Sequence, residues 1–191
     1  MEISKLQKAV GVKDDGIIGR NTLTAVFQKL GANSSRAAEL GLAANVHLDA
    51  YSINTQLRFC HFMAQLTHES GNFRYMEEIA SGVAYEGRKD LGNVLKGDGV
   101  RFKGRGPIQL TGRANYRKYG QELGIDLENN PEIVAIPSFG LLVACKYWQN
   151  NNLNVFADHD DVLTITRRIN GGLNGIEDRK SKLSTIKGWF K

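Results

Sequence analysis

The sequence contains little cysteine and no long apolar run. Only two of its 191 residues are cysteines, Cys60 and Cys145, and they lack the short spacing of a zinc site. Each lies in an apolar pattern, so we expect buried free thiols in a reducing compartment. No window approaches the roughly 18 apolar residues of a membrane-spanning helix, and the start MEISKLQKAV lacks the apolar core of a signal peptide. These absences predict a protein that is made in a cytoplasm and does not insert into a membrane.

Motifs for metals and nucleotides are also missing. His61 and His68 lie seven residues apart on a predicted helix, but no HExxH motif and no third ligand accompany them. The stretch GVRFKGRG has Arg105 and Gly106 where a phosphate-binding loop has Lys and Ser or Thr. We therefore expect no metal and no cofactor, and we expect His68 to pack in the protein and orient a neighbour.

The charge of the chain is positive, with a formal net charge of +5. Such a charge favours polyanionic partners without choosing among nucleic acid, an anionic cell envelope and acidic lipid. Basic residues concentrate between positions 96 and 118, where they alternate with glycines and not with aromatic residues that would stack on bases. This tract is either a solvated loop or the wall of an anion-facing groove, and we expect no nucleic-acid partner.

Apolar residues recur at helical spacing along most of the chain, which predicts a mainly α protein. Seven helices are expected, over 3–12, 20–31, 37–51, 55–69, 114–124, 137–151 and 160–172. Residues 79–112 are rich in glycine and irregular, and long ordered loops of this kind usually carry function. The only strand candidates are short pieces such as FKGRGPIQLT, so we expect no more than a small β-hairpin.

The polar segment ANSSR, residues 32–36, is the one plausible seam between domains. It divides the chain into a helical hairpin over 1–32, which has one apolar face, and a main domain over 33–191. The hairpin must pack against something, because an exposed apolar helix face is unfavourable.

A carboxylate continues the apolar face of the helix predicted over 55–69. Phe59, Phe62, Leu66 and Glu69 share this face. Apolar neighbours and the negative end of the helix dipole both favour a protonated carboxyl group, which is what a general acid needs. The alternative is that Glu69 only ends the helix and reaches solvent. Hydrolysis of a glycosidic bond commonly uses a second carboxylate, and the candidates are Glu77, Glu78 and Glu86.

Three motifs carry a resemblance to a known family. FMAQLTHESGNF, GRGPIQLTGRANY and RRINGG occur in the order seen in family-nineteen glycoside hydrolases, the chitinase-like group that includes many bacteriophage endolysins. The chain is most similar to the phage lysozyme branch, over residues 34 to 185. The resemblance implies an α-rich, lysozyme-like, two-lobed fold with a substrate cleft, and an inverting mechanism.

The same resemblance implies roles for individual residues. Glu69 matches the general acid, Glu78 the general base with Glu77 and Glu86 as alternatives, and Thr111 a hydroxyl that holds the attacking water. The glycines at 104, 106 and 112 are expected to let the backbone approach the substrate. Substrate contacts are expected from His68, Tyr85, Arg105, Gln109, Asn115, Tyr116, Asn170 and Arg179.

Two features distinguish this chain within the family. Leu173 and Asn174 stand where plant-type chitinases carry an acidic residue after the INGG glycines, and the several cysteines of those enzymes are absent. The N-terminal DDGIIGRNTL resembles the helical peptidoglycan-binding repeat of wall hydrolases, although only about half a module is present. Residues 1–32 therefore either bind cell wall or brace the catalytic domain.

These observations predict a monomeric endolysin that hydrolyses β-1,4 bonds of peptidoglycan glycan strands and lyses the host cell. It would lie in the host cytoplasm before its release to the wall. A chitinase on the same fold is the alternative within the class, and a non-catalytic wall-binding or nucleic-acid-binding protein is the alternative outside it.

Overall fold

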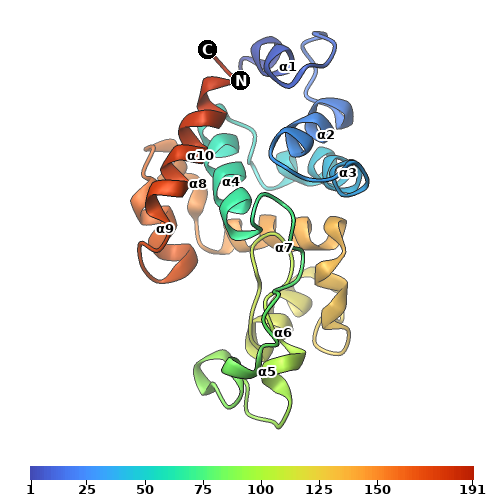
Figure 1. The fold of residues 1–191 in the computed structure, drawn as a ribbon, viewed down its shortest axis with the longest axis vertical. Coiled ribbons are helices and arrows are strands. Elements are labelled where there is room, and N and C mark those ends of the chain that lie inside the picture. Colours follow the sequence, from blue (N-terminus) through green and yellow to red (C-terminus); the bar gives the residue numbers. More distant parts are fainter.

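The computed structural model describes residues 1–191 and shows an almost entirely helical protein in two parts (Figure 1). The larger upper part contains α1–α4 and α8–α10, and the smaller lower part contains α5 and α6, with α7 crossing between them. The helices are α1 (Ile3–Val10), α2 (Arg20–Lys29), α3 (Ser34–Ala50), α4 (Gln56–Glu69), α5 (Asp98–Arg101), α6 (Arg113–Leu123), α7 (Pro137–Asn150), α8 (Leu153–Asp158), α9 (Val162–Asn170) and α10 (Ile176–Gly188). Three short 3-10 helices, η1 (Val83–Tyr85), η2 (Lys89–Leu91) and η3 (Pro131–Ala135), complete the structure. None of these helices combines the length and the hydropathy needed to cross a membrane.

The predicted helix over 55–69 is confirmed, and Thr55 is its N-cap. The Thr55 side chain accepts a hydrogen bond from the backbone N–H of Arg58, which satisfies an orphan donor at the N-terminus of α4. Gly71 follows the helix with φ of 56° and ends it in the left-handed conformation. The negative end of the α4 dipole therefore lies at Glu69.

The expected seam over 32–36 is not a linker. Asn33 accepts from the backbone N–H of Arg36 and starts α3, and Ser34 is already helical. Polar residues at this position serve as a helix cap and first turn, a role for which Asn and Ser are well suited. The chain passes from the hairpin into α3 with no flexible segment between them.

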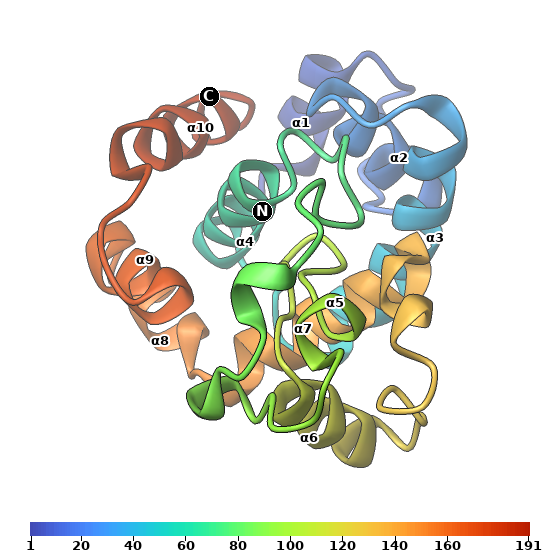
Figure 2. The ribbon, with the colours of Figure 1, turned by 60° about the horizontal axis from the view of Figure 1, so that its bottom comes forward.

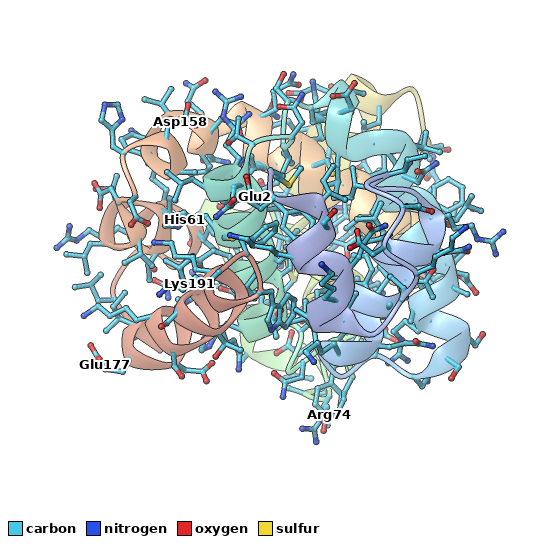
Figure 3. All side chains as sticks on the ribbon, turned by 90° about the horizontal axis from the view of Figure 1, so that it is seen from above. Glu2, His61, Arg74, Asp158, Glu177 and Lys191 are labelled. Atoms are coloured by element: carbon cyan, nitrogen blue, oxygen red, sulfur yellow. The ribbon has the colours of Figure 1, made fainter.

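Three α-helices were not predicted. α5 has only four residues and lies in the segment over 79–112 that was expected to be irregular. α8 is only six residues long. α10, IEDRKSKLSTIKG, has apolar residues at 176, 183 and 186 only, so it lacks the repeated apolar spacing from which amphipathic helices are recognised. It forms because it packs along α4, as the view from above shows with Glu177 near its start and Lys191 beyond its end (Figure 3).

The N-terminal hairpin belongs to the same hydrophobic core as the rest of the protein. Leu6, Leu23 and Phe27 are buried in one cluster with the apolar residues of α3, α4 and α7. The Phe27 ring meets the edge of Phe73 with a centroid distance of 5.0 Å, an arrangement that aromatic pairs favour. The hairpin therefore braces the larger part of the molecule, and wall binding by this segment stays a prediction.

The DDGIIGRNTL motif has a structural explanation. The buried amide of Gln7 accepts from the backbone N–H groups of Asp15 and Gly16 at 3.1 and 2.9 Å, and donates to the Asp15 carboxylate at 2.8 Å and to Thr22 at 3.1 Å. The motif thus fixes the turn between α1 and α2, because Asp15, Gly16 and Thr22 are all hydrogen-bonded to one buried side chain.

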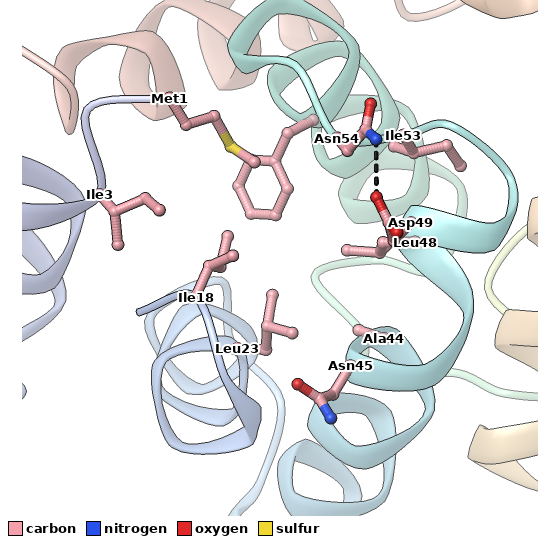
Figure 4. Close-up of a pocket in the computed structure, with 11 residues that line it drawn as sticks. Met1, Ile3, Ile18, Leu23, Ala44, Asn45, Leu48, Asp49, Ile53 and Asn54 are labelled. Carbon is pink, nitrogen blue, oxygen red and sulfur yellow. Dashed lines mark hydrogen bonds between the residues drawn. The ribbon is translucent and has the colours of Figure 1, made fainter. Parts of the chain in front are cut away.

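An apolar cavity of about 260 Å³ lies between the hairpin, α3 and the start of α4 (Figure 4). Met1, Ile18, Leu23, Leu48 and Phe59 are among its lining residues. It contains none of the predicted catalytic or substrate-binding residues.

The lower part is held by buried polar groups because it has little regular structure. The buried Asn93 donates to the Tyr85 carbonyl at 2.9 Å and accepts from the backbone N–H of Arg113 at 2.9 Å. The Arg113 guanidinium pairs with Asp98, whose side chain is 2% exposed, and with Glu128. These contacts join the irregular segment over 79–112 to α6.

The expected β-hairpin over 102–111 contains no regular strand. It is reduced to two isolated bridges, Glu77 with Arg105 and Arg105 with Leu110. Glycines at 104 and 106 and Pro107 disfavour an extended ladder, so the segment forms a compact loop.

The ion-pair cluster of the lower part predicts a loss of stability in acid. Hydrogen bonds from Arg117, and secondarily from Arg113, hold the pKa of Glu128 at about 2 against the effect of partial burial. Because this pKa is below the unfolded value, the stabilisation is present above pH 4.5 and is lost as the pH falls toward 2. We expect Glu128→Gln to lower the free energy of unfolding by about 1 to 2 kcal/mol at pH 7, and by much less at pH 2.5, in urea titrations. Equal losses at both pH values would contradict this assignment.

Candidate active site

Glu69 is positioned by a buried arginine. It is the last residue of α4, and its side chain is 17% exposed. The Arg179 guanidinium, 2% exposed, donates one N–H to the Glu69 carboxylate and another to the side-chain oxygen of Gln65. Gln65 and Glu69 lie one turn apart on α4, so a single guanidinium contacts both. Charge-assisted hydrogen bonds of this type fix the direction of the carboxylate.

This contact corrects the sequence interpretation in two respects. The neighbours of Glu69 are not only apolar, because the Arg179 guanidinium donates a hydrogen bond to its carboxylate. Arg179 was expected to contact the substrate, but it is buried and its donors are used within the protein. Its role in the structure is to orient Glu69. The buried Gln65 was missed, although its spacing of four residues from Glu69 could have indicated it.

His68 forms a second polar contact between α4 and α10. Its Nδ1 lies 2.6 Å from the Asp178 carboxylate, which also accepts from Lys182 at 3.0 Å. Burial opposes ionisation of Asp178, but the hydrogen bonds from His68 and Lys182 outweigh it and lower the pKa of this carboxyl group. Gly175 gives the imidazole room, since a Cβ there would lie 2.2 Å from the ring. His68 thus packs and orients, as expected, and its contact with substrate stays a prediction.

The three candidates for the second carboxylate have different partners. Glu77 pairs with Arg105 and Lys103. Glu86 accepts hydrogen bonds from the backbone N–H groups of Gly97 and Gly99, at 2.6 and 2.8 Å, and caps α5. Glu77 is therefore neutralised by cations, and Glu86 stabilises a helix terminus.

Glu78 is held by two neutral donors. The Tyr85 hydroxyl donates to Oε1 at 3.0 Å and the backbone N–H of Gly104 donates to Oε2 at 3.1 Å. Burial, together with the hydrogen bond to Glu78, raises the pKa of Tyr85, so the phenol stays a donor. Tyr85 was predicted to contact substrate, and in the structure it positions Glu78. Because no cation neutralises the Glu78 carboxylate, this group is the best suited of the three to accept a proton.

Thr111 and Gln109 lie beside Glu78 around Gly104. A Cβ on Gly104 would lie 3.3 Å from Glu78 Oε2, 3.3 Å from Thr111 Oγ1 and 2.8 Å from Gln109 Oε1. Only glycine leaves this space open. The Thr111 hydroxyl donates to the Gln109 carbonyl at 2.9 Å, which leaves its oxygen as an acceptor for a further partner.

The other two glycines serve internal packing. A Cβ on Gly106 would lie 3.1 Å from the Val134 carbonyl oxygen, and one on Gly112 would lie 2.7 Å from Leu91. Both have positive φ, 72° and 93°, which glycine adopts at little cost. Packing within the protein therefore explains these two glycines, and the expectation that they bring backbone to the substrate stays a prediction. Gly104 borders the predicted site.

Several predicted substrate contacts are structural residues. Tyr116 is fully buried and donates to the Lys103 carbonyl at 2.8 Å. The Arg105 side chain, 8% exposed, binds Glu77, Tyr116 and the Arg101 carbonyl. Both are enclosed because they fasten the 102–111 loop to α6, so the prediction that they bind sugar is wrong.

The remaining polar residues also have internal partners. Gln109 donates to the Gly106 carbonyl at 2.9 Å and Asn115 to the Thr111 carbonyl at 2.7 Å. The Asn170 amide closes the turn after α9 through Gly172 and Asn174. Their contact with a sugar stays a prediction.

Glu69 and Glu78 thus come from different kinds of structure. Glu69 ends α4, a core helix that lies next to α10. The loop after α4 carries Glu78 and descends to the lower part of the molecule (Figures 1 and 2). Two carboxyl groups in different environments can divide the roles of acid and base in hydrolysis.

Comparisons with known proteins support this interpretation. The profile of the family described as chitinase class I matches residues 60–168. A glycosyl hydrolase family 19 domain-containing protein of Haemophilus influenzae is 34% identical over 150 residues, which cover 62% of this chain and 72% of that protein. An endochitinase of Arabidopsis thaliana is 37% identical over 140 residues, covering 69% of this chain but only 45% of that protein.

A solved structure has the same fold. Chitinase C from Streptomyces griseus superposes with a TM-score of 0.71 at 22% sequence identity, over 87% of this chain and 75% of that one. Together with the match over residues 60–168, which includes Glu69, Glu78 and Thr111, these relationships show that the chain belongs to glycoside hydrolase family 19 and is a glycosidase.

Proposed function

We propose that this glycosidase is an endolysin that cleaves the β-1,4 bond between N-acetylmuramic acid and N-acetylglucosamine in bacterial peptidoglycan. Its action on the wall, after release from the host cytoplasm, would lyse the cell. The observation that supports hydrolysis most directly is the contrast between Glu69, held by Arg179, and Glu78, held only by Tyr85 and Gly104.

In the proposed mechanism Glu69 is the general acid. It donates its proton to the bridging oxygen, and the Arg179 guanidinium stabilises the carboxylate that remains. Arg179 also holds the Glu69 side chain in one orientation, so little conformational entropy is lost when the substrate binds.

Glu78 is the general base. It removes a proton from a water molecule that attacks the opposite face of the sugar, and an inverting enzyme needs roughly 6.5 to 9.5 Å between the two carboxyl groups to admit this water. Thr111 Oγ1 and Glu78 Oε2 each lie 3.3 Å from the Cβ position of Gly104, and the free acceptor position of Thr111 would hold the water.

Three features of the chain favour peptidoglycan over chitin. Leu173 and Asn174 replace the acidic residue that follows the INGG motif in plant-type chitinases. The net charge of +5 favours anionic envelopes. The hairpin contains the DGxxGxxT pattern of wall-binding repeats. Chitin hydrolysis is the second candidate, because the Arabidopsis relative is named an endochitinase.

The choice of substrate is tested with purified sacculi and with N-acetylglucosamine oligomers. We expect release of reducing ends from sacculi at a kcat/KM at least about tenfold above that for the oligomers, with activity on sacculi falling as salt screens the positive charge. Efficient cleavage of chitin oligomers together with intact sacculi at every ionic strength would identify a chitinase.

The role of Glu69 is tested by Glu69→Gln. Glutamine preserves an acceptor for Arg179 but has no proton to donate, so we expect kcat to fall by about 10² to 10⁴-fold with an unchanged thermal midpoint. Mass spectrometry should exclude deamidation back to Glu. A non-catalytic binding protein predicts unchanged lytic activity in this variant.

The identity of the base is tested by comparing Glu78→Gln with Glu86→Gln. We expect Glu78→Gln to lose about 10² to 10⁴-fold in kcat. Glu86→Gln weakens a helix cap and should cost about 1 kcal/mol of stability with kcat within twofold of the wild type. The reverse pattern would assign the base to Glu86.

A further inference from the structure

A polar groove of about 260 Å³ lies outside the site described above, along one side of α10. Its lining combines the end of the N-terminal hairpin, the residue after the Gly71 turn and α10 itself. The polar and aromatic members are Lys29, Thr67, Asn72, Asp178, Ser181, Lys182, Thr185 and Trp189, and we call this the α10 groove.

Several polar groups of the α10 groove have no partner in the protein. The side chains of Asn72, Ser181 and Thr185 make no hydrogen bond with other residues of the chain, and Lys29 pairs with no carboxylate. The backbone of Asn72 is nevertheless closely packed. It has φ of 64°, and its Cβ and carbonyl oxygen each lie 2.9 Å from the position that a Cβ on Gly31 would take. Lys29, Ser181 and Thr185 are exposed, so their polar groups are available to a ligand that enters the concave surface.

The charge of the α10 groove favours an anionic ligand. It contains two ammonium groups and one carboxylate, Asp178, which is already bonded to His68 and Lys182. Lys29 lies 5.9 Å from the centre of the Trp189 ring, and Trp189 is 9% exposed. Because the ring is mostly covered, it offers no open face on which a sugar could stack, whereas the ammonium groups and hydroxyls suit a carboxylate-bearing peptide.

The position of the α10 groove relates it to catalysis. Asp178 is bonded to His68, the chain neighbour of Glu69, so one end of the groove lies next to the predicted general acid. From Asp178 to Trp189 the helix rises by roughly 16 Å. An extended peptide of four or five residues spans roughly the same length.

We propose that the α10 groove binds the carboxylate-bearing peptide stem carried by the muramic acid residue of a strand held at Glu69. This inference rests on the proposed function, because chitin carries no such stem. The N-terminal hairpin would then contribute to selection of the substrate through Lys29, in addition to bracing the core.

Kinetics with two glycan substrates test the proposal. One is intact sacculi, and the other is the same glycan after an amidase has removed the stems. We expect Lys29→Glu and Thr185→Glu each to raise KM for intact sacculi about tenfold, with kcat/KM for the stem-free glycan within twofold of the wild type. Lys13→Glu, which makes the same charge change at an exposed position of the same hairpin, is the matched control and should affect both substrates equally. An equal rise in KM on both substrates for the groove variants would overturn the proposal.

Direct binding separates failure of this proposal from failure of the proposed function. Trp148 is buried and its indole N–H is bonded to Asn154 at 2.8 Å, so Trp189 should dominate ligand-dependent tryptophan fluorescence. An N-acetylated alanine–D-glutamate–diaminopimelate–D-alanine peptide should change this fluorescence in the wild type and not in Lys29→Glu. Cleavage of sacculi without a response to the peptide would refute only the groove. A response to the peptide in a protein that cleaves only chitin oligomers would support the groove and refute the peptidoglycan function.

Discussion

The architecture around the predicted general acid depends on one buried cation. Arg179 can be enclosed only because the Glu69 carboxylate and the Gln65 amide satisfy its donors, since an unpaired buried charge would cost several kcal/mol. The same contact fixes the position of α10, because α10 must lie along α4 for Arg179 to reach Gln65 and Glu69. A helix with few apolar residues is thus fixed in place by the same contact that orients the predicted general acid.

The two predicted catalytic carboxylates are supported in different ways. Glu69 belongs to a rigid helix, whereas Glu78 lies on a loop that is organised by Asn93, the Arg113 ion pairs and the buried Tyr116. Most of the polar residues in the family motifs are therefore used to shape this loop. Few of them remain free for a sugar, so the loop acts mainly as a support for Glu78, Thr111 and Gly104.

The hairpin has a structural role in the core, and it also borders the proposed α10 groove. Its apolar side chains complete the core, and its Gln7 network fixes the turn. The same packing places Lys29 and Gly31 against α10 and Asn72. A surface between this segment and the catalytic part forms only because the two share a core.

The sequence alone determined the helical class, the helix that ends at Glu69 and the family motifs, because these depend on local spacing and side-chain chemistry. It did not determine α10, the partners of Glu69 or the enclosure of Arg105 and Tyr116. Those features depend on contacts between residues about 10 to more than 100 positions apart. Tertiary packing also gave the three glutamates different hydrogen-bond donors. Glu77 contacts a guanidinium, Glu86 a helix terminus and Glu78 neutral groups. These donors come from parts of the chain that no local pattern connects to the glutamates.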